Sequence, residues 1–365
     1  MRDAFFMNRA IMLSTRARGM TSPNPMVGAV IVKNGKIIAE GYHRKPGTPH
    51  AEALAITAAG EKTRASTLYV SLEPCCHTDK RTPPCTRTII DSGIKRVVMA
   101  MRDPNPKVSG KGMKELERAG IEVVTGVLEE KAKQVNEYYI KYITTRRPFV
   151  ILKVAMTLDG KIATGAGQSK WITGEKSRMM VHRLRSSVDA VMTAIGTVKA
   201  DDPQFTARIR NGRNPVRILI DPSLEVSPDA KILRVPPETV IVTKNTRNPA
   251  LLKKANKLFS MGSYIILYKH TLELNWLMKK LGEKGITSIV IEGGSSLNAH
   301  ALEDGIVDKV MLFIAPKIMG GTASYPAVGG KTLRDLDEAY RLKNTTVKRL
   351  GEDLLVEGYL TSSPA

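Results

Sequence analysis

The segment Thr67-Leu68-Tyr69-Val70-Ser71-Leu72-Glu73-Pro74-Cys75 joins a short apolar run to the first of two Pro-Cys pairs in the chain. The run Thr67 to Ser71 is rich in β-branched and aromatic residues, which predicts a strand. The second pair ends the segment Thr82-Pro83-Pro84-Cys85, and a helix is expected near residues 86–91. The segment therefore predicts one part of an α/β layer, next to a cluster of potential metal ligands.

The rest of the first half repeats this alternation of strand and helix. Two strand-like runs, residues 27–32 and 37–40, flank Asn34-Gly35, the dipeptide that favours a type I′ hairpin turn. Further strands are expected at residues 96–101 and 121–125. Helices are expected at residues 51–59, 111–119 and 129–143, the last as one long closing helix.

A second α/β series follows Thr144-Thr145-Arg146-Arg147-Pro148, the best candidate for a linker. We place the domains at residues 1–145 and 146–365. Strands of the second domain are expected at residues 149–154, 190–194, 216–220, 239–242, 264–267, 288–291 and 309–314. Helices between them, notably at residues 174–186 and 272–284, favour a mostly parallel sheet.

Composition describes an ordinary globular protein, with 42% hydrophobic and 25% charged residues among 365. The formal net charge of +21 suggests a nucleic-acid partner, but it divides almost equally between residues 1–148 and 149–365 and forms no arginine-rich block. We interpret it as a basic surface that suits anionic small substrates, and we expect no nucleic acid as partner.

No membrane partner is expected either, because no run of eighteen apolar residues occurs. Polar residues interrupt the basic N-terminal stretch, which excludes a secretory signal. This stretch fits a first amphipathic helix whose apolar residues include Ala4, Phe5, Ile11 and Leu13. The chain is therefore expected to be cytoplasmic.

All three cysteines, Cys75, Cys76 and Cys85, lie within eleven residues, which favours metal binding over a disulfide framework. His50, in Pro49-His50-Ala51-Glu52-Ala53, would complete a set of one imidazole and two thiolates with Cys75 and Cys85. Three protein ligands leave the fourth tetrahedral position of a zinc ion open for water, which then ionises near neutral pH.

Glu52 is the candidate proton carrier of this site. Residues two apart do not share a helix face, so His50 must lie just before the helix and Glu52 in its first turn. Glu52 could then take a proton from the water and pass it to a leaving amine. Cys85 just before a helix would gain thiolate character from the helix dipole. Cys76 is expected to be a small buried thiol beside the metal.

Two alternatives stay open at this point. A structural zinc site would be closed by four ligands and would not need Glu52. A nucleic-acid deaminase of the tRNA type would concentrate positive charge beside the zinc.

The His-x-Glu and Pro-Cys pattern is typical of zinc nucleobase deaminases. However, the ten-residue step from Cys75 to Cys85 departs from the plain cytidine-deaminase or tRNA-deaminase spacing.

Five segments resemble, in order and spacing, the bifunctional riboflavin-biosynthesis deaminase/reductase family. They are Ser22-Pro23-Asn24-Pro25-Met26-Val27-Gly28-Ala29-Val30, His50-Ala51-Glu52, Glu73-Pro74-Cys75, Thr82-Pro83-Pro84-Cys85 and Asp103-Pro104-Asn105-Pro106. The resemblance implies a cytidine-deaminase-like three-layer domain that removes the 2-amino group of a diaminopyrimidinone ribosylamine phosphate. It also implies substrate contacts at Asn24, His77, Arg81, Asp103 and Asn105. The family usually has Ser at the place of Cys76 and one residue fewer between its cysteines.

The second half is less explicit without the resemblance. Gly293-Gly294 ends a strand before a helix, where backbone N–H groups can bind a phosphate, although many such pairs are plain turns. Lys153, Asp159 and Gly160 end a strongly apolar strand, where function often gathers. The segments Leu152 to Lys161, Ser169-Lys170-Trp171-Ile172-Thr173, Gly196-Thr197-Val198 and Ala200-Asp201-Asp202-Pro203 resemble the reductase module of the same family.

That module implies a dihydrofolate-reductase-like α/β fold, NADPH as cofactor and hydride transfer to the ribosyl C1′, which opens the sugar to a ribityl chain. The NADPH contacts implied are Ala155, Trp171, Thr197, Asp201, Pro222 and the loop Gly294-Ser295-Ser296-Leu297-Asn298-Ala299-His300. The substrate contacts implied are Ser169, Arg185, Phe205, Arg208 and Glu292, and the two arginines suit a phosphate. Lys153 is our candidate for proton delivery. Self-association to a dimer or tetramer is expected from the resemblance alone.

Overall fold

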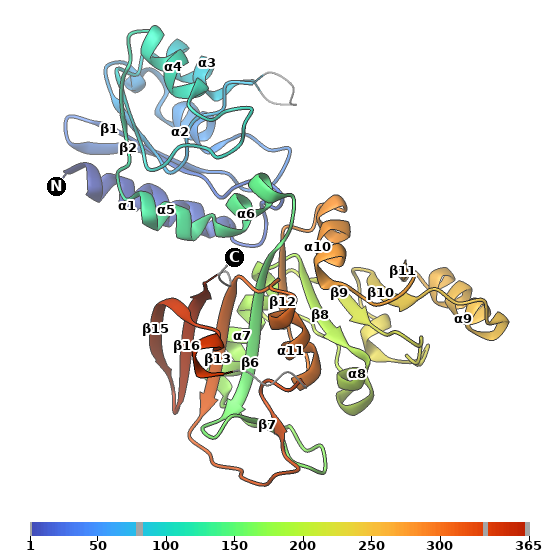
Figure 1. The fold of residues 1–365 in the computed structure, drawn as a ribbon. Coiled ribbons are helices and arrows are strands. Elements are labelled where there is room, and N and C mark those ends of the chain that lie inside the picture. The colour runs from blue at the N-terminus through green and yellow to red at the C-terminus, as the bar shows by residue number, and fades with distance from the viewer. Residues whose placement is uncertain (1, 78–82, 331–334, 362–365) are drawn as a thin grey trace. The chain divides into compact units, whose positions relative to one another are not determined.

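The computed structural model describes residues 2–77, 83–330 and 335–361, and the chain divides into two compact units, Met1–Arg146 and Arg147–Ala365 (Figure 1). No helix of the described residues is both long and apolar enough to cross a membrane. Thr144 and Thr145, expected in a linker, instead end the last helix of the first unit. The chain leaves that helix through Arg146, whose φ of 57° is left-handed.

The first unit is built on a five-stranded sheet in the order β2-β1-β3-β4-β5. Its strands are β1 (Gly28–Lys33), β2 (Lys36–Tyr42), β3 (Thr67–Val70), β4 (Arg96–Met99) and β5 (Glu122–Thr125). β1 pairs antiparallel with β2 and β3, whereas β3, β4 and β5 are parallel. Asn34 and Gly35 have φ values of 51° and 73°, as a type I′ hairpin turn requires.

Helices cover both faces of this sheet. One layer contains α1 (Arg2–Ser14), α5 (Glu129–Val135) and α6 (Glu137–Thr145), and the other α2 (Ala51–Ala59), α3 (Cys85–Asp91) and α4 (Lys111–Arg118). The short 3-10 turns are η1 (Thr15–Ala17) and η2 (Gly60–Thr63). Val30 and Val32 of β1 pack toward the first layer and Ala29 and Ile31 toward the second, because side chains alternate along a strand. The expected three-layer fold is confirmed.

Two expectations for this unit are wrong in detail. The single helix expected at residues 129–143 is broken at Asn136, whose buried side chain accepts from Met26 N at 2.8 Å and donates to Met26 O at 3.0 Å. The helix is interrupted where this side chain bonds the loop before β1. In α1, Phe5 is exposed, and Phe6 and Met7 fill the core instead.

The second unit contains a nine-stranded sheet in the order β11-β10-β9-β8-β12-β6-β13-β16-β15. These strands are β6 (Phe149–Thr157), β8 (Ala190–Ala194), β9 (Val216–Ile220), β10 (Thr239–Lys244), β11 (Tyr264–Tyr268), β12 (Ser288–Ile291), β13 (Lys309–Ala315), β15 (Leu342–Leu350) and β16 (Asp353–Leu360). The strands from β11 through β13 are parallel, and β16 and β15 add an antiparallel edge. The mostly parallel sheet is confirmed, but the sequence patterns missed the β15–β16 hairpin.

The helices of this unit are α7 (Glu175–Ser187), α8 (Ile195–Asp201), α9 (Pro249–Ser260), α10 (Leu274–Glu283) and α11 (Ser295–Glu303), with η3 (Lys231–Leu233) and η4 (Leu336–Glu338). A small second sheet pairs β7 (Lys161–Ala163) with β14 (Tyr325–Pro326). One face of the large sheet forms the main core with α10 and α11. Val154 of β6 faces this core, so Lys153 and Ala155 lie on the opposite face.

Candidate functional site

Three side chains from three segments converge at the amino end of α2. His50 is the N-cap residue of α2, Cys85 is the first residue of α3, and Cys75 lies in the loop after β3. The Nδ1 atom of His50 lies 3.5 Å from Sγ of Cys75 and 3.2 Å from Sγ of Cys85. One imidazole nitrogen and two sulfurs at this separation fit a zinc ion that keeps one coordination position open. Cys76, expected to be buried, is only half-buried, and within the described ranges it is not part of this ligand group.

Glu52 lies in the first turn of α2 with only 3% of its surface exposed, so the expected placement of His50 before the helix and Glu52 within it is confirmed. Burial, together with the nearby Cys75, raises the pKa of Glu52. Its Oε2 is buried and has no hydrogen-bond partner among the described residues. Such an orphaned carboxylate oxygen requires a further donor, and a reacting water would supply one.

The buried carboxylate of Glu73 fixes the loop that carries Cys75. It accepts hydrogen bonds from the backbone N–H groups of Asp103 at 3.2 Å, Gly110 at 2.9 Å and Met113 at 3.2 Å. The loop after β4 and the start of α4 are thereby tied to the Glu73-Pro74-Cys75 motif. Thr86 N also donates to Cys75 O at 3.3 Å, which links the segments of the two cysteines.

His43, a residue that sequence reasoning missed, connects Asn24 to the metal ligands. Its Nε2 lies 3.3 Å from the side-chain nitrogen of Asn24, and its Nδ1 lies 3.4 Å from Pro49 O. Its ring meets the ring of His50 edge to face, with centroids 5.2 Å apart. His43 is buried directly after β2, but an isolated histidine gives no spacing signal by which the sequence could have identified it.

Asp103 and Asn105 form a second polar group of this unit. Oδ1 of Asp103 accepts from the hydroxyl of Tyr139 at 2.8 Å and from Asn105 N at 2.9 Å. Burial raises the pKa of Asp103 to about 6. Tyr139, on α6, is a partner that the sequence patterns did not reveal. His77 ends the described part of the cysteine loop, and Arg81 lies outside the described residues.

In the second unit, Glu292 joins two of the expected functional side chains. It follows β12, and its carboxylate accepts from Arg185 at 2.6 Å and 3.0 Å and from Lys153 Nζ at 3.3 Å. Burial alone would raise the pKa of Glu292, but the charges of Arg185 and Lys153 outweigh it and lower the pKa to about 2. Fork-shaped pairing with a carboxylate fixes the plane of the Arg185 guanidinium.

The segment Phe205 to Arg208 lies beside this group. The guanidinium carbon of Arg185 lies 5.3 Å from the centre of the Phe205 ring, and Arg185 Nη1 donates to Thr206 O at 3.2 Å. Arg208 Nε donates to the Thr206 hydroxyl at 3.2 Å. Phe205 and Arg208 have left-handed φ values of 52° and 47°, a conformation that non-glycine residues hold only when their surroundings enforce it.

Thr197 and Gly294 lie in the segments that follow the carboxyl ends of the parallel strands β8 and β12. Gly294 is the N-cap of α11, and Ser295 to His300 are helical rather than a loop, with Leu297 and Ala299 buried. Oγ of Ser295 is buried without a hydrogen-bond partner among the described residues. A Cβ at Gly294 would lie 3.8 Å from the Thr197 hydroxyl, so α8 and α11 begin close together. Helix N-termini with free N–H groups suit a dinucleotide phosphate.

Two further contacts involve expected cofactor or substrate residues. Ser169 Oγ donates to Asp201 at 3.2 Å, and Lys170 pairs with the same carboxylate at 3.3 Å. Trp171 is 64% exposed, and the guanidinium carbon of Arg178 lies 4.7 Å from the centre of its ring. Ala155 lies two residues beyond Lys153 on β6, on the same face of the strand.

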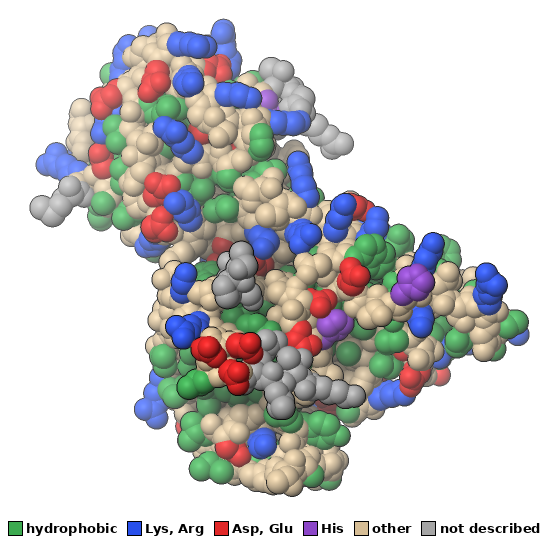
Figure 2. All heavy atoms as spheres, in the orientation of Figure 1, with side chains coloured by type: hydrophobic (Ala, Val, Ile, Leu, Met, Phe, Trp, Pro, Cys, Tyr) green, Lys and Arg blue, Asp and Glu red, His purple; other side chains and the backbone are tan. Residues whose placement is uncertain are grey.

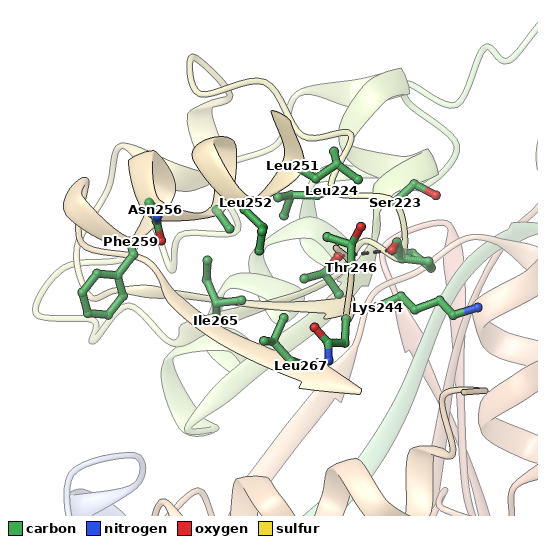
Figure 3. A pocket seen from close by; sticks show the side chains of 14 residues that line it. Ser223, Leu224, Lys244, Thr246, Leu251, Leu252, Asn256, Phe259, Ile265 and Leu267 are labelled. Carbon is green, nitrogen blue, oxygen red and sulfur yellow. Dashed lines mark hydrogen bonds between the residues drawn. The ribbon is translucent and has the colours of Figure 1, made fainter. Parts of the chain in front are cut away.

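Pro222 lines a cavity of about 390 Å³ at the carboxyl ends of β9 and β10 (Figure 3). Leu251, Leu252 and Phe259 of α9 and Ile265 and Leu267 of β11 form its apolar walls. Ser223, Lys244 and Thr246 supply polar groups at its rim. In the sheet, β8 lies between β9, which borders the cavity, and β12, which Glu292 follows.

The family described as "Cytidine and deoxycytidylate deaminase zinc-binding region" matches residues 1–101, and the "RibD C-terminal domain" family matches residues 148–356. The riboflavin biosynthesis protein RibD of Actinobacillus pleuropneumoniae is 44% identical over 100% of this chain and 96% of its own length. RibD of Aquifex aeolicus is 46% identical over 97% of each chain.

Solved structures agree over the full length. The structure of Acinetobacter baumannii RibD, form 1, superposes with a TM-score of 0.89 at 35% identity and covers 99% of each chain. A deaminase/reductase from Thermotoga maritima, acting on diaminohydroxyphosphoribosylaminopyrimidine and 5-amino-6-(5-phosphoribosylamino)uracil, gives a TM-score of 0.87 at 39% identity and 99% coverage.

Proposed function

Because the chain belongs to the family of bifunctional riboflavin-biosynthesis deaminase/reductases, we propose that His50, Cys75, Cys85 and Glu52 form its deaminase centre and that Lys153, Arg185 and Glu292 belong to its reductase centre. The protein is a zinc-dependent deaminase and an NADPH-dependent reductase. A nucleic-acid deaminase is not favoured, since the chain matches riboflavin-biosynthesis proteins along its whole length. Lys and Arg side chains are spread over the face drawn in Figure 2.

At the deaminase centre, His50, Cys75 and Cys85 would hold the zinc ion, which when bound would act as a Lewis acid and make a water molecule nucleophilic near neutral pH. As the oxygen of that water bonds to the carbon that carries the 2-amino group, Glu52 accepts a proton from the water. The protonated carboxyl then passes the proton to the amine, which leaves as ammonia. The raised pKa of Glu52 suits this double role, because a carboxyl of ordinary pKa would hold the proton too weakly to deliver it.

We assign the substrate side of this centre to Asn24, His77, Arg81, Asp103 and Asn105. The contacts of Asn24 with His43 and of Asp103 with Tyr139 support the assignment, because each fixes the orientation of a polar side chain. His77 and Arg81 belong to the segment between the two cysteines, and a cation there would suit the substrate phosphate.

At the reductase centre, NADPH supplies a hydride to the ribosyl C1′ of the deaminated compound. We propose that Ser169, Arg185, Phe205, Arg208 and Glu292 hold this substrate. Lys153 delivers a proton to the ribose ring oxygen as the sugar opens to the ribityl chain. The pairing of Lys153 with Glu292 at 3.3 Å supports this role, because the carboxylate holds the ammonium group in one position.

The proposed NADPH contacts are Ala155, Trp171, Thr197, Asp201, Pro222 and Gly294, Ser295, Ser296, Leu297, Asn298, Ala299 and His300. In a parallel sheet, dinucleotides lie across the carboxyl ends of the strands. The diphosphate would then meet the backbone N–H groups at the start of α11, and the adenosine end would lie toward Pro222 and its cavity. Leu297 and Ala299 can contribute only through their backbone, since their side chains are buried.

We also propose a cytoplasmic homo-oligomer, a dimer or a tetramer, with domains at residues 1–145 and 146–365 and no nucleic-acid or membrane partner. Reduced thiols such as those of Cys75 and Cys85 persist in the cytoplasm. The exposed edge strand β15 supports self-association, since it leaves unpaired backbone groups at the end of the sheet. Light scattering on the purified chain tests the oligomer.

The convergence of His50, Cys75 and Cys85 beside a buried Glu52 is the observation that carries the proposed deaminase centre. The test supplies diaminohydroxyphosphoribosylaminopyrimidine with and without NADPH. Ammonia release should not need NADPH, whereas NADPH oxidation should follow ammonia release. Oxidation of NADPH that precedes any ammonia would contradict the proposed assignment of the two steps.

A further inference from the structure

His182 lies on α7 one turn before Arg185, and no motif considered above includes it. Its Nδ1 lies 3.2 Å from the carbonyl oxygen of Thr206. Arg185 Nη1 donates to the same oxygen, also at 3.2 Å. A carbonyl oxygen has two lone pairs, so two donors from one face of α7 satisfy it completely. Because a carbonyl can only accept, Nδ1 of His182 must carry the hydrogen.

The carbonyl that these two donors hold lies between the two strained residues of its segment. Phe205 and Arg208, on either side, both have left-handed φ values. Phe205 lies under the guanidinium of Arg185, and Arg208 reaches back to the Thr206 hydroxyl. On the far side, Ala207 N donates to Asn214 Oδ1 at 3.0 Å. The backbone of this segment is therefore held from both sides.

We propose that His182 is a positioning residue of the reductase centre, which holds the Thr206 carbonyl and so presents Phe205 and Arg208 to the phosphorylated sugar of the substrate. The inference rests on the proposed substrate contacts of Arg185, Phe205 and Arg208. Arg185 holds the same carbonyl through Nη1 alone, since Glu292 accepts from its other two nitrogens, so loss of the His182 donor leaves this carbonyl with one donor in place of two. Burial and the charges of Arg185 and Arg208 lower the pKa of His182, which keeps the ring neutral near pH 7.

Two substitutions of His182 distinguish the effect of losing the hydrogen bond from the effect of losing the volume of the ring, and a third substitution is the control. In His182→Asn the amide nitrogen takes the place of Nδ1 and keeps the donor, whereas His182→Leu keeps volume without a donor. Arg183→Gln is the control, since Arg183 is exposed on the same helix. Each full-length variant is assayed for NADPH oxidation with 5-amino-6-(5-phosphoribosylamino)uracil, and tryptophan fluorescence checks folding.

His182→Leu should raise KM for this substrate about tenfold, the loss expected for one neutral hydrogen bond, while KM for NADPH and kcat change less than threefold. His182→Asn should restore KM to within about threefold of the wild-type value. In an Arg208→Ala background, His182→Leu should have a much smaller effect, because the two residues act through one segment.

Equal KM values for His182→Leu and wild type would overturn the proposal, as would equal damage in the Leu and Asn variants. If His182→Leu does not fold, His182→Ala, which also removes the donor, takes its place. Additive effects of His182→Ala and Arg208→Ala on KM would then overturn the proposal, because they would exclude action through one segment. An Arg208→Ala enzyme with normal KM would instead refute the proposed substrate contact. That outcome is distinct from a failure of His182 itself.

Discussion

The proposed role of Glu52 depends on its position in the first turn of α2, where it is buried close to the proposed metal ligands. Glu52→Gln keeps the shape of the side chain but removes the proton carrier, so ammonia release should fall by roughly 10²–10⁴-fold. Zinc content and NADPH oxidation with the deaminated substrate should stay at wild-type levels. Glu61→Gln, at an exposed carboxylate after the same helix, is the control, and normal ammonia release from Glu52→Gln would refute the role of Glu52.

Because of Glu292, the free energy of unfolding of the second unit should fall at acidic pH. Its folded pKa of about 2 lies below the ordinary 4.5, so its ion pairs stabilise the fold above pH 4.5 and lose that contribution as the pH falls toward 2. The loss amounts to about 3 kcal/mol, at about 1.4 kcal/mol per pKa unit. Urea unfolding followed by tryptophan fluorescence measures it, because Trp171 and Trp276 both lie in this unit.

The matched variants for this measurement are Glu292→Gln and, at an exposed carboxylate, Glu238→Gln. Glu292→Gln should be less stable at pH 7 and should lose less stability than the wild type between pH 4.5 and 2.5. Glu238→Gln should follow the wild-type curve. Parallel curves for all three proteins would show that Glu292 is not held as an ion by Arg185 and Lys153.

Single residues were predictable where the chemistry requires rare residue types at short spacing. His50, Glu52, Cys75 and Cys85 met that condition, and their geometry is the one the sequence implied. His43 and Tyr139 did not, because each acts on a residue far away in the chain, and an isolated His or Tyr carries no spacing information. The same holds for Thr206, which acts through its backbone carbonyl.

Among the elements, α4 depends on one glycine for its position against the metal loop. A Cβ at Gly112 would lie 2.2 Å from the carbonyl oxygen of Pro74 and 3.3 Å from Glu73 Oε1. Gly112→Ala should therefore displace the loop of Cys75 and destabilise the first unit by about 1–3 kcal/mol. Thermal unfolding and the rate of zinc removal by a chelator measure the two effects.

Lys114→Ala, on the exposed side of α4, controls for the added alanine. It should match the wild type in both measurements. If Gly112→Ala also retained wild-type stability and held zinc as firmly, the close packing of α4 on Pro74 would have no part in forming the metal site.

Elements with a clear hydrophobic period were predicted well. For example, α2 and β12 begin and end at the residues expected from the sequence. The errors fall where tertiary contacts override the pattern. The helix expected through residue 143 breaks because Asn136 is used to bond Met26. The hairpin of β15 and β16 was missed because β15 is exposed on both faces and so lacks an alternating pattern.

For the whole molecule, the two centres should work as separate catalysts. Glu52→Gln supplies a reductase without a deaminase, and Lys153→Ala supplies the reverse. Neither variant alone should form the reduced product from diaminohydroxyphosphoribosylaminopyrimidine and NADPH at more than a few per cent of the wild-type rate, an effect typical of losing an acid–base group. An equimolar mixture should form it, with a lag while the intermediate accumulates. A mixture as inactive as its parts would show that the centres do not act independently.

The structure forms two compact units, as the two α/β series of the sequence suggest. Two α/β series separated near residue 146 are visible in hydrophobic pattern alone, and the chain forms two compact units there. Strand order was out of reach, because the pattern of a parallel strand does not identify its neighbours. The reductase centre was therefore identified by resemblance, and its ion pairs of Lys153 and Arg185 with Glu292 only by the structure.

The central claim is a zinc ion held by three protein ligands and open at the fourth position. X-ray absorption at the zinc edge of the full-length protein tests it most directly. One zinc per chain is expected, with two sulfur ligands at about 2.3 Å and two nitrogen or oxygen ligands at about 2.0–2.1 Å, one of which is His50. A third sulfur, from Cys76, or a chain that binds no zinc would contradict the claim.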